Sequence, residues 1–504
     1  MAVTLPILIL ILSLEITQAL EKSIRANSKK LTYPQKVYRL YKNISFRCIW
    51  FCDGLPTYNL QTFEKILQEA VHHGLNPRDY EPPEDLDLEL SYTDRLIKLS
   101  YDLYYGKVNP SKIYGNWSLQ SKPDTVVETL SRLLLENRLE DLFLELAPKS
   151  KDYWFLVEKS KFLKDLSYLE WKPIRINREL KLGDRSPCLT EIGYRLFLLG
   201  DLEEYTGSDL FDEKLQRAMK HFQKRHGLPE TGSIDQRTLR ELNMRPEERL
   251  RQVYINLEKH RWVNIDSRRA VLVNIPSFEL FYIEGGRVVL TSKVIVGRNY
   301  KEDFRPTPML QSKINSITIN PKWYVPLSIS VKDILPKVKK DPTYLKRKGF
   351  KVFYMGEEID PMHINWNLYK EDYFPFKLVQ EAGPKNALGR IKFNFPNPFA
   401  VYLHDTPDKH LFRQAKRAFS SGCIRVERAK DLALKLLGED WSIERLESTI
   451  KKGETRNIAL KESVPIYLLY FTAFEEDGKL QFREDLYGYD TILLQAILKA
   501  GGGI

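Results

Sequence analysis

The spacing of apolar residues divides the chain into a helical first half and a strand-rich second half. From about residue 22 to 177, segments such as LQTFEKILQEAVHHGL carry apolar residues three and four positions apart, which predicts amphipathic helices. Between residues 180 and 243 the same spacing predicts three shorter helices, one stopping at Gly227 and the next starting near Asp235. After the linking helix, apolar and polar residues alternate in RAVLVNIPSFELFYI and RVVLTSKVIVG, which predicts a β-hairpin.

The strand-rich half contains one long interruption and ends in a second predicted hairpin. The charged stretch from 328 to 373 breaks the alternation, and we interpret it as an inserted loop or lid. A strand is expected at FAVYL and a helix over ERAKDLALKLLG. The last run, VPIYLLYFTAFEEDGKLQFREDLYGYD, turns at Asp477–Gly478 and is expected to return a strand to the same sheet.

At 504 residues the chain is too long for one small core, so these patterns mark several domains. The predicted fold class is multidomain α+β. The boundaries that we predict are 1–20 for a signal peptide or N-terminal anchor, 21–177 for a helical scaffold, 178–245 for a three-helix module, 250–445 for a mainly-β domain with its insert at 328–373, and 446–504 for a segment that completes its sheet.

The N-terminus resembles a secretory signal. An apolar run from Leu5 to Ile16 precedes the small residues of Thr17-Gln18-Ala19, and it is shorter than the roughly 20 residues that span a bilayer. An uncleaved N-terminal anchor is the alternative. We therefore expect an exported protein that meets a membrane only through such an anchor.

Charge and cysteine content narrow the function classes only a little. The chain has 78 Lys and Arg against 67 Asp and Glu, a net charge of +11, but it lacks zinc-finger spacing and a phosphate-binding glycine loop, so nucleic acid is not favoured. Four cysteines are too few for a disulfide scaffold. Cys48 and Cys52 either form a disulfide or are two buried apolar groups on a helix, and Cys188 is expected to be structural.

Cys423 and His404 are the residues with the clearest chemical potential. His404 ends an apolar run, and Cys423 follows nineteen residues later in a Ser-Ser-Gly-Cys turn. We expect a helix to begin just after this turn, where its partial positive charge, with Arg425, would favour the thiolate. An imidazole within hydrogen-bond reach would take the thiol proton. Gly422 lets the backbone turn sharply, and main-chain N–H groups of the turn, with the Ser421 hydroxyl, would bind an oxyanion.

Two other interpretations of this pair remain open. A Cys and a His nineteen residues apart are most often unrelated. A zinc site is the second alternative, although His404, His410 and Cys423 lack ligand spacing and a fourth partner. His410 falls in an amphipathic stretch and is expected to be solvated.

Four motifs, YLHDTP, SSGCIRV, NALGRIKF and NPKWYVP, strongly resemble those of the L,D-transpeptidases of the bacterial cell wall. The resemblance is to the large subgroup with a helical scaffold, a peptidoglycan-binding module and a capping insert. The segment from 180 to 243 is also similar to the small peptidoglycan-binding module, through LFD, FQKRHGL and TGSID. The resemblance implies a mainly-β L,D-transpeptidase catalytic domain at 250–445, capped by the insert, with the scaffold at 21–177.

The resemblance also implies a mechanism. The Cys423 thiolate attacks the carbonyl of the third stem residue, a meso-diamino acid, and expels the terminal D-Ala; an amine of a second stem then takes the acyl group. His404 acts as base and then as acid, and the main-chain carbonyl of Asp405, where many relatives have Gly, orients its ring. Further implied site residues are Ser421, Gly422 and Arg425 around the nucleophile, the aromatic residues Tyr402, Trp323 and Tyr324, and Asn386, Gly389 and Arg390 before the catalytic strand.

The implied partners are donor and acceptor stem peptides, with a carbapenem as covalent inhibitor, and neither a cofactor nor a metal is implied. The implied location is the periplasm or cell envelope, and the insert would exclude water from the acyl-enzyme. Two alternatives stay open: a cysteine peptidase or L,D-carboxypeptidase, in which water accepts the acyl group, and a non-catalytic peptidoglycan-binding protein.

Overall fold

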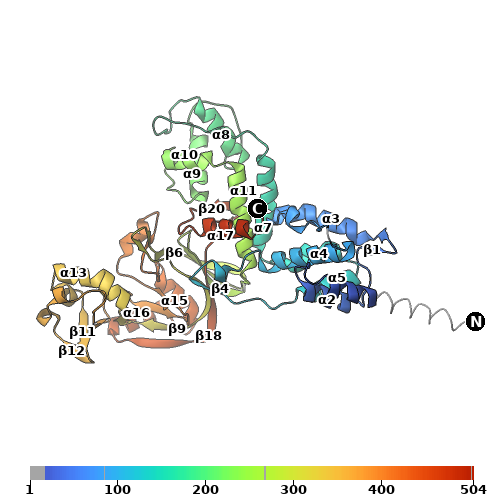
Figure 1. Cartoon of the computed structure of the whole chain (residues 1–504). Coiled ribbons are helices and arrows are strands. Elements are labelled where there is room, and N and C mark those ends of the chain that lie inside the picture. Colours follow the sequence, from blue (N-terminus) through green and yellow to red (C-terminus); the bar gives the residue numbers. More distant parts are fainter. Residues whose placement is uncertain (1–17, 85, 266–267, 501, 504) are drawn as a thin grey trace, which may run out of the picture. The chain divides into compact units, whose positions relative to one another are not determined.

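The computed structural model describes residues 18–84, 86–265, 268–500 and 502–503 (Figure 1). It consists of two compact units. The helical unit comprises residues up to 115, residues 120–264 and residues from 472 onward, and the sheet unit comprises 116–119 and 265–471. The apolar run of the expected signal or anchor lies outside the described residues. Among the described residues, no helix has both the length and the apolar character to cross a membrane.

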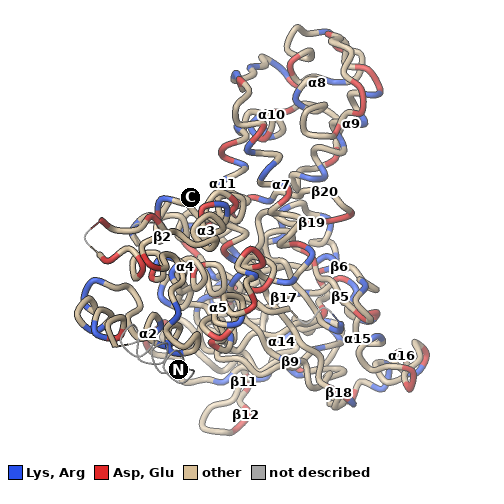
Figure 2. The backbone as a smooth tube through the Cα atoms, turned by 90° about the vertical axis from the view of Figure 1, so that its right-hand side faces the viewer, with Lys and Arg blue, Asp and Glu red and all other residues tan. Residues whose placement is uncertain are grey.

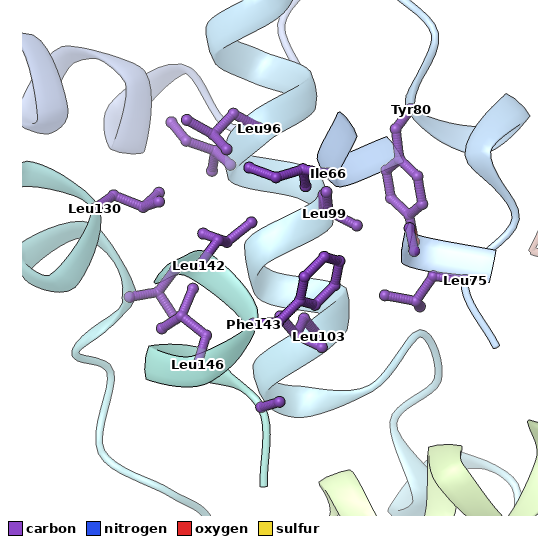
Figure 3. Close-up of a cluster of buried hydrophobic side chains, with 14 of the residues drawn as sticks. Ile66, Leu75, Tyr80, Leu96, Leu99, Leu103, Leu130, Leu142, Phe143 and Leu146 are labelled. Carbon is purple, nitrogen blue, oxygen red and sulfur yellow. The ribbon is translucent and has the colours of Figure 1, made fainter. Parts of the chain in front are cut away.

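Helices with apolar residues on one face build the first part of the helical unit. These are α2 (Pro34–Asn43), α3 (Tyr58–Ala70), α4 (Leu88–Tyr105), α5 (Val126–Leu135), α6 (Leu142–Leu146) and α7 (Lys151–Leu166). Along α4, the three- and four-residue spacing of Leu96, Leu99 and Leu103 places all three on the buried face. Figure 3 shows them among apolar side chains from neighbouring helices. The expected helical scaffold is confirmed.

A second helical group has a core of its own. It consists of α8 (Cys188–Leu198), α9 (Glu213–Arg225) and α10 (Gln236–Asn243), and the longer α11 (Pro246–Arg261) follows. Leu196, Met219 and Phe222 are fully buried between the three shorter helices. Asp235 is the N-cap of α10, since its carboxylate accepts from the Thr238 N–H at 2.8 Å. The three predicted helices are therefore present.

Cys48 and Cys52 form a disulfide, with their Cα atoms 5.6 Å apart. The helix that we considered for them is wrong, because β1 (Phe51–Cys52) and β2 (Leu55–Pro56) form a hairpin there. Asp53 and Gly54 turn the chain with φ of +53° and +78°, which an α-helix does not contain. Cys188 is a free thiol at the start of α8.

The sheet unit is built on one large sheet that closes on itself. Its strands are β3 (Trp117–Ser118), β4 (Arg269–Asn274), β5 (Glu279–Glu284), β6 (Arg287–Gly297), β9 (Met309–Ile319), β14 (Ile391–Asn394), β15 (Leu403–His404), β16 (Ala418–Ser420), β17 (Ile424–Val426) and β18 (Arg456–Leu469). The order is β14-β15-β17-β6-β5-β4-β18-β9-β3, and β14 also pairs with β9, which closes a barrel. The predicted hairpin is present, since β5 pairs antiparallel with β4 and β6.

The end of the chain differs from our expectation. β18 joins the large sheet, but β19 (Ala473–Glu476) and β20 (Lys479–Phe482) form a separate two-stranded sheet, and α17 (Tyr489–Lys499) follows. Ala473, Leu480 and Phe482 are buried in the core of the helical unit. The prediction that the last hairpin returns to the same sheet is therefore wrong beyond β18, because the apolar residues of that hairpin are buried elsewhere.

The interruption predicted as a loop at 328–373 is a folded subdomain that extends further at both ends. We call residues 323–380 the insert. Its sheet has the order β10 (Trp323–Tyr324), β13 (Lys377–Gln380), β11 (Phe350–Tyr354) and β12 (Glu357–Ile359). Short helices, including α13 (Leu335–Lys340) and α14 (Tyr344–Arg347), pack with it around Val338, Leu345 and Val352.

Figure 2 shows Lys and Arg interspersed with Asp and Glu along the chain.

Candidate active site

Two short parallel strands bring Cys423 and His404 to the same sheet face. β15 and β17 pair with Leu403 opposite Ile424 and His404 opposite Arg425. Because side chains alternate along a strand, Tyr402 and His404 on one chain share a face with Cys423 and Arg425 on the other. The Ile424 N–H donates to the Tyr402 carbonyl at 3.1 Å, which extends the pairing to the residues just before each strand.

The helix expected directly after Cys423 begins later. Ile424, Arg425 and Val426 form β17, and α15 (Ala429–Leu437) follows it. Ile424 and Val426 are buried while the intervening Arg425 is not, which is the alternation of a strand. The charge at a helix terminus acts only over its first turn, so the expected stabilisation of the thiolate by a helix is wrong.

Burial, rather than a nearby helix, dominates the chemistry of the thiol. Removal from water raises the pKa of Cys423 above its ordinary value, while hydrogen bonds from the N–H and hydroxyl of Tyr402 and the charges of Lys392 and Arg425 act in the opposite direction. The net direction is upward. The resting cysteine is therefore held mainly as the neutral thiol.

This direction predicts how Cys423 reacts with an alkylating agent. In a Cys188→Ala background, which leaves one free thiol among the described residues, the iodoacetamide rate should keep rising with pH past the ordinary thiol pKa of 9.0. The reason is that the thiolate fraction still increases there. Stopped-flow or mass-spectrometric rates between pH 6 and 10 measure it. A plateau already reached at pH 7 would contradict the assigned direction.

His404 is buried and held in one orientation. Its Nδ1 lies 2.5 Å from the main-chain oxygen of Asp405, the contact that the family resemblance implies. Burial lowers the pKa of His404 to about 3, and the charge of Arg425 adds to this effect. The imidazole is therefore neutral at physiological pH, and with Nδ1–H donating to the carbonyl, Nε2 is the proton acceptor. The sulfur of Cys423 is hydrogen-bonded to Tyr402 rather than to this ring.

The Ser421 hydroxyl points away from the role that we expected for it. Its Oγ accepts hydrogen bonds from Arg298 at 2.7 Å and Arg305 at 3.1 Å, and it donates to Asp333 at 3.2 Å. These three partners occupy the hydroxyl. Ser421 therefore holds the loop that carries Cys423, and it is not available to an oxyanion.

Other atoms of the same turn are also engaged. Gly422 has φ of +114°, its N–H donates to the Ser420 hydroxyl at 3.1 Å, and its carbonyl accepts from the Thr307 hydroxyl at 2.9 Å. The Cys423 N–H makes no hydrogen bond within the part of the chain that the structure describes. Of the expected oxyanion donors, this N–H is the one that remains available.

Two arginines and two aspartates link the insert to the turn that carries Cys423. We call Arg298, Asp303, Arg305 and Asp333 the ion-pair cluster. Arg305 contacts Asp333 through both terminal nitrogens at 2.6 and 3.0 Å, and both arginines contact Asp303 at 2.6 Å. Asp333 belongs to the insert, whereas Ser421 precedes the cysteine by two residues. The cluster therefore fastens the insert to the turn that presents Cys423.

The predicted aromatic residues separate into two groups. The Tyr402 hydroxyl interacts with both Cys423 and Trp323, so Trp323 on β10 brings the insert to the site. The ring of Tyr402 also meets that of His404 edge to face, with centroids 5.8 Å apart. Tyr324, the next residue on β10, is 73% exposed. The structure thus places Tyr402 beside the sulfur, places Trp323 against the Tyr402 hydroxyl, and leaves Tyr324 on the surface.

The NALGRIKF motif, which precedes β15 along the chain, supports Asp405. Gly389 has φ of +63°, and the Arg390 N–H donates to the Asp405 carboxylate at 2.9 Å. Asn386 donates to the Pro321 carbonyl at 3.0 Å and is buried. Arg390 thus supports the segment that carries Asp405, next to His404, whereas Asn386 anchors the chain near Pro321.

Gly389→Ala should therefore lower stability. An added Cβ would lie 2.4 Å from the Asp405 carboxylate oxygen, and the left-handed backbone alone costs about 1–2 kcal/mol for a residue with a side chain. We expect the free energy of unfolding to fall by at least that amount, measured by urea denaturation followed by fluorescence. Gly383→Ala is the matched control, because its Cβ would meet nothing within 4 Å. Equal stability of the two variants would contradict this account.

Sequence reasoning missed Lys392, Arg298, Arg305, Thr307 and Asp333. Lys392 lies within the recognised NALGRIKF motif, between the buried residues Ile391 and Phe393, and this alternation was a usable signal that it shares a face with the site. The other four come together only through the pairing of distant segments. No spacing along the chain indicates that contact.

Comparison with known proteins adds family assignments to this geometry. Residues 268–450 match the L,D-transpeptidase catalytic domain family, residues 35–159 match the scaffold domain family, and residues 189–242 match the family described as "Putative peptidoglycan binding domain". A Haemophilus influenzae protein described as "Putative L,D-transpeptidase" is 39% identical over 227 residues, which are 45% of each chain. The chain thus matches about half the length of this curated relative.

Solved structures give a much weaker similarity. An L,D-transpeptidase from Xylanimonas cellulosilytica is 14% identical, with 59% of this chain and 100% of that chain covered and a TM-score of 0.19. An L,D-transpeptidase from Stackebrandtia nassauensis is 13% identical, with 60% and 97% covered and a TM-score of 0.22.

The domain matches agree with the fold described above. The helical scaffold, the three-helix module and the closed sheet each coincide with one of the matched families. The chain therefore contains a domain of the L,D-transpeptidase catalytic family at residues 268–450, together with segments that match a scaffold domain family and a family of the peptidoglycan-binding type.

Proposed function

We propose that this chain is a peptidoglycan L,D-transpeptidase that links the third residues of two stem peptides through a cysteine acyl-enzyme. The observation that carries the proposal is the placement of Cys423 and His404 on one face of paired strands, with the imidazole oriented by the Asp405 carbonyl. This placement occurs inside the segment that matches the catalytic domain family.

We infer that the thiol loses its proton during the attack on the substrate rather than before it. Because the resting thiol and imidazole are both neutral, the Sγ proton passes to Nε2 of His404 as the sulfur attacks the carbonyl carbon of the third stem residue. The Cys423 N–H stabilises the oxyanion. His404 then returns the proton to the departing nitrogen of D-Ala, which leaves a thioester.

The second half of the reaction uses the same imidazole. The side-chain amine of a second stem attacks the thioester carbonyl, its proton passes through His404, and the Cys423 sulfur leaves as a thiol. We assign to the insert the exclusion of water from the thioester. Its attachment through Asp333 and the contact of Trp323 with Tyr402 support this role.

The proposed partners and location follow from the same assignments. Donor and acceptor stem peptides are the substrates, and a carbapenem is proposed to acylate Cys423. A domain of the peptidoglycan-binding type favours the cell envelope, and the disulfide between Cys48 and Cys52 is typical of proteins in an oxidising compartment.

The test uses the full chain and purified tetrapeptide-stem fragments, with products identified by mass spectrometry. We expect one released D-Ala for each dimer formed, and fragmentation that joins the two third residues directly. Released D-Ala without dimer would establish a carboxypeptidase instead. Binding of the fragments with neither product would leave a peptidoglycan-binding protein.

A further inference from the structure

The sheet face that carries Cys423 also carries an ammonium group without an acidic partner. β14 pairs antiparallel with β15 so that Lys392 lies directly opposite His404. Its Nζ lies 4.2 Å from the centre of the Tyr402 ring, and the hydroxyl of that tyrosine interacts with Cys423. One aromatic side chain thus separates the ammonium from the sulfur.

Other cations around the nucleophile have carboxylate partners. Arg425 lies 3.5 Å from Asp408, and the ion-pair cluster neutralises Arg298 and Arg305. Within the described ranges, no carboxylate lies within 4.0 Å of the Lys392 ammonium, and the side chain is half-buried. Burial lowers the pKa of Lys392, a sign that the charge is incompletely solvated. Such a group has a strong tendency to bind an anion.

We propose that Lys392 binds the terminal carboxylate of the donor stem peptide and thereby selects stems that end one residue after the bond to be broken. The inference rests on the proposed function, because the donor stem supplies the anion. In such a stem the carboxylate is attached to the carbon next to the scissile nitrogen, only a few bonds from the carbonyl that Cys423 attacks. That short separation fits an ammonium and a sulfur on either side of Tyr402.

The role is one of specificity rather than of chemistry. A stem extended by one residue presents a neutral amide at this position, and its carboxylate lies further away. The carboxylate bound by Lys392 departs with D-Ala, so the lysine contributes to formation of the acyl-enzyme and not to its transfer to the second amine.

The test compares two donor stems that differ only in their last group, a free carboxylate or a carboxamide. The wild-type enzyme should prefer the carboxylate by about 10- to 100-fold in kcat/KM, the range for a hydrogen bond to a charged group. Lys392→Met should remove this preference, chiefly by raising KM for the carboxylate stem, and Lys392→Arg should restore part of it. Lys313→Met, at an exposed position of β9, is the matched control and should keep the preference.

The preference is also measured by binding, as the Kd of the carboxylate stem and the Kd of the carboxamide stem in a Cys423→Ala background. This measurement does not require turnover. Binding with the expected preference in this background, together with no turnover by the wild-type enzyme, would reject the proposed function and retain the carboxylate site. A Lys392→Met enzyme that keeps the wild-type ratio overturns the site, whatever its absolute rate. The site is also overturned if amidation of the second carboxylate of the diamino acid weakens binding while amidation of the terminal carboxylate does not.

Discussion

Cys423→Ala is expected to abolish D-Ala release and dimer formation, with a loss of at least about 10⁴-fold in kcat. The reason is that every proposed covalent step passes through the sulfur, and removal of a nucleophile leaves only binding and electrostatic contributions. The measurement is the rate of D-Ala release from tetrapeptide stems. Intact-mass analysis after incubation with a carbapenem should show one adduct on the wild type and none on the variant.

Cys188→Ala is the matched control for this prediction. Cys188 is the second free cysteine of the described chain and starts a helix in another domain, so its removal should leave both the rate and the adduct unchanged. Product formation that survives Cys423→Ala would reject the assigned nucleophile. An adduct lost on Cys188→Ala instead would do the same.

His404→Ala is expected to lower kcat by about 10² to 10⁴-fold, the contribution typical of a positioned general base. Burial raises the pKa of the Cys423 thiol, so the thiol stays protonated at neutral pH. The variant lacks the imidazole that would remove this proton. Part of the loss should be recovered as the pH rises, because hydroxide then generates thiolate directly. The pH dependence of acyl-enzyme formation measures this effect.

His410→Ala provides the control for the imidazole. His410 lies on an exposed 3₁₀ turn, Lys409–Arg413, so its replacement should change neither the rate nor its pH dependence. A His404→Ala enzyme with the wild-type pH profile would show that another group accepts the proton.

Periodicity along the chain predicted those elements whose buried face is long. The spacing of Leu96, Leu99 and Leu103 and the alternation through β4, β5 and β6 leave little choice of structure. The insert escaped this reasoning because its strands and helices are short. Their buried residues, such as Val352 and Leu345, are separated by lysines and turns, so no run is long enough to show a period.

The candidate site was predictable in its chemistry but not in its electrostatics. The motifs around His404 and Cys423 identified the pair, and the pairing of β15 with β17 places both on one face. We expected a lowered thiol pKa because we placed a helix start directly after Cys423. The three-residue strand Ile424–Val426 that lies there is too short for its residue pattern to be distinguished from the start of the next helix. The alternation around Lys392 indicates which face of β14 it lies on, but only the register of β14 against β15 shows that it lies opposite His404, so its place in the site was missed.

The ion-pair cluster has a consequence for how this architecture changes among relatives. Asp333 belongs to the insert, while Arg298, Arg305 and Ser421 belong to the barrel. Transplanting the insert onto a barrel that lacks these arginines would leave the Asp333 carboxylate without a cationic partner beside the turn that carries Cys423. Inheritance of the insert should thus be tied to the two arginines, and engineered chimaeras should exchange the four residues of the ion-pair cluster together with the insert.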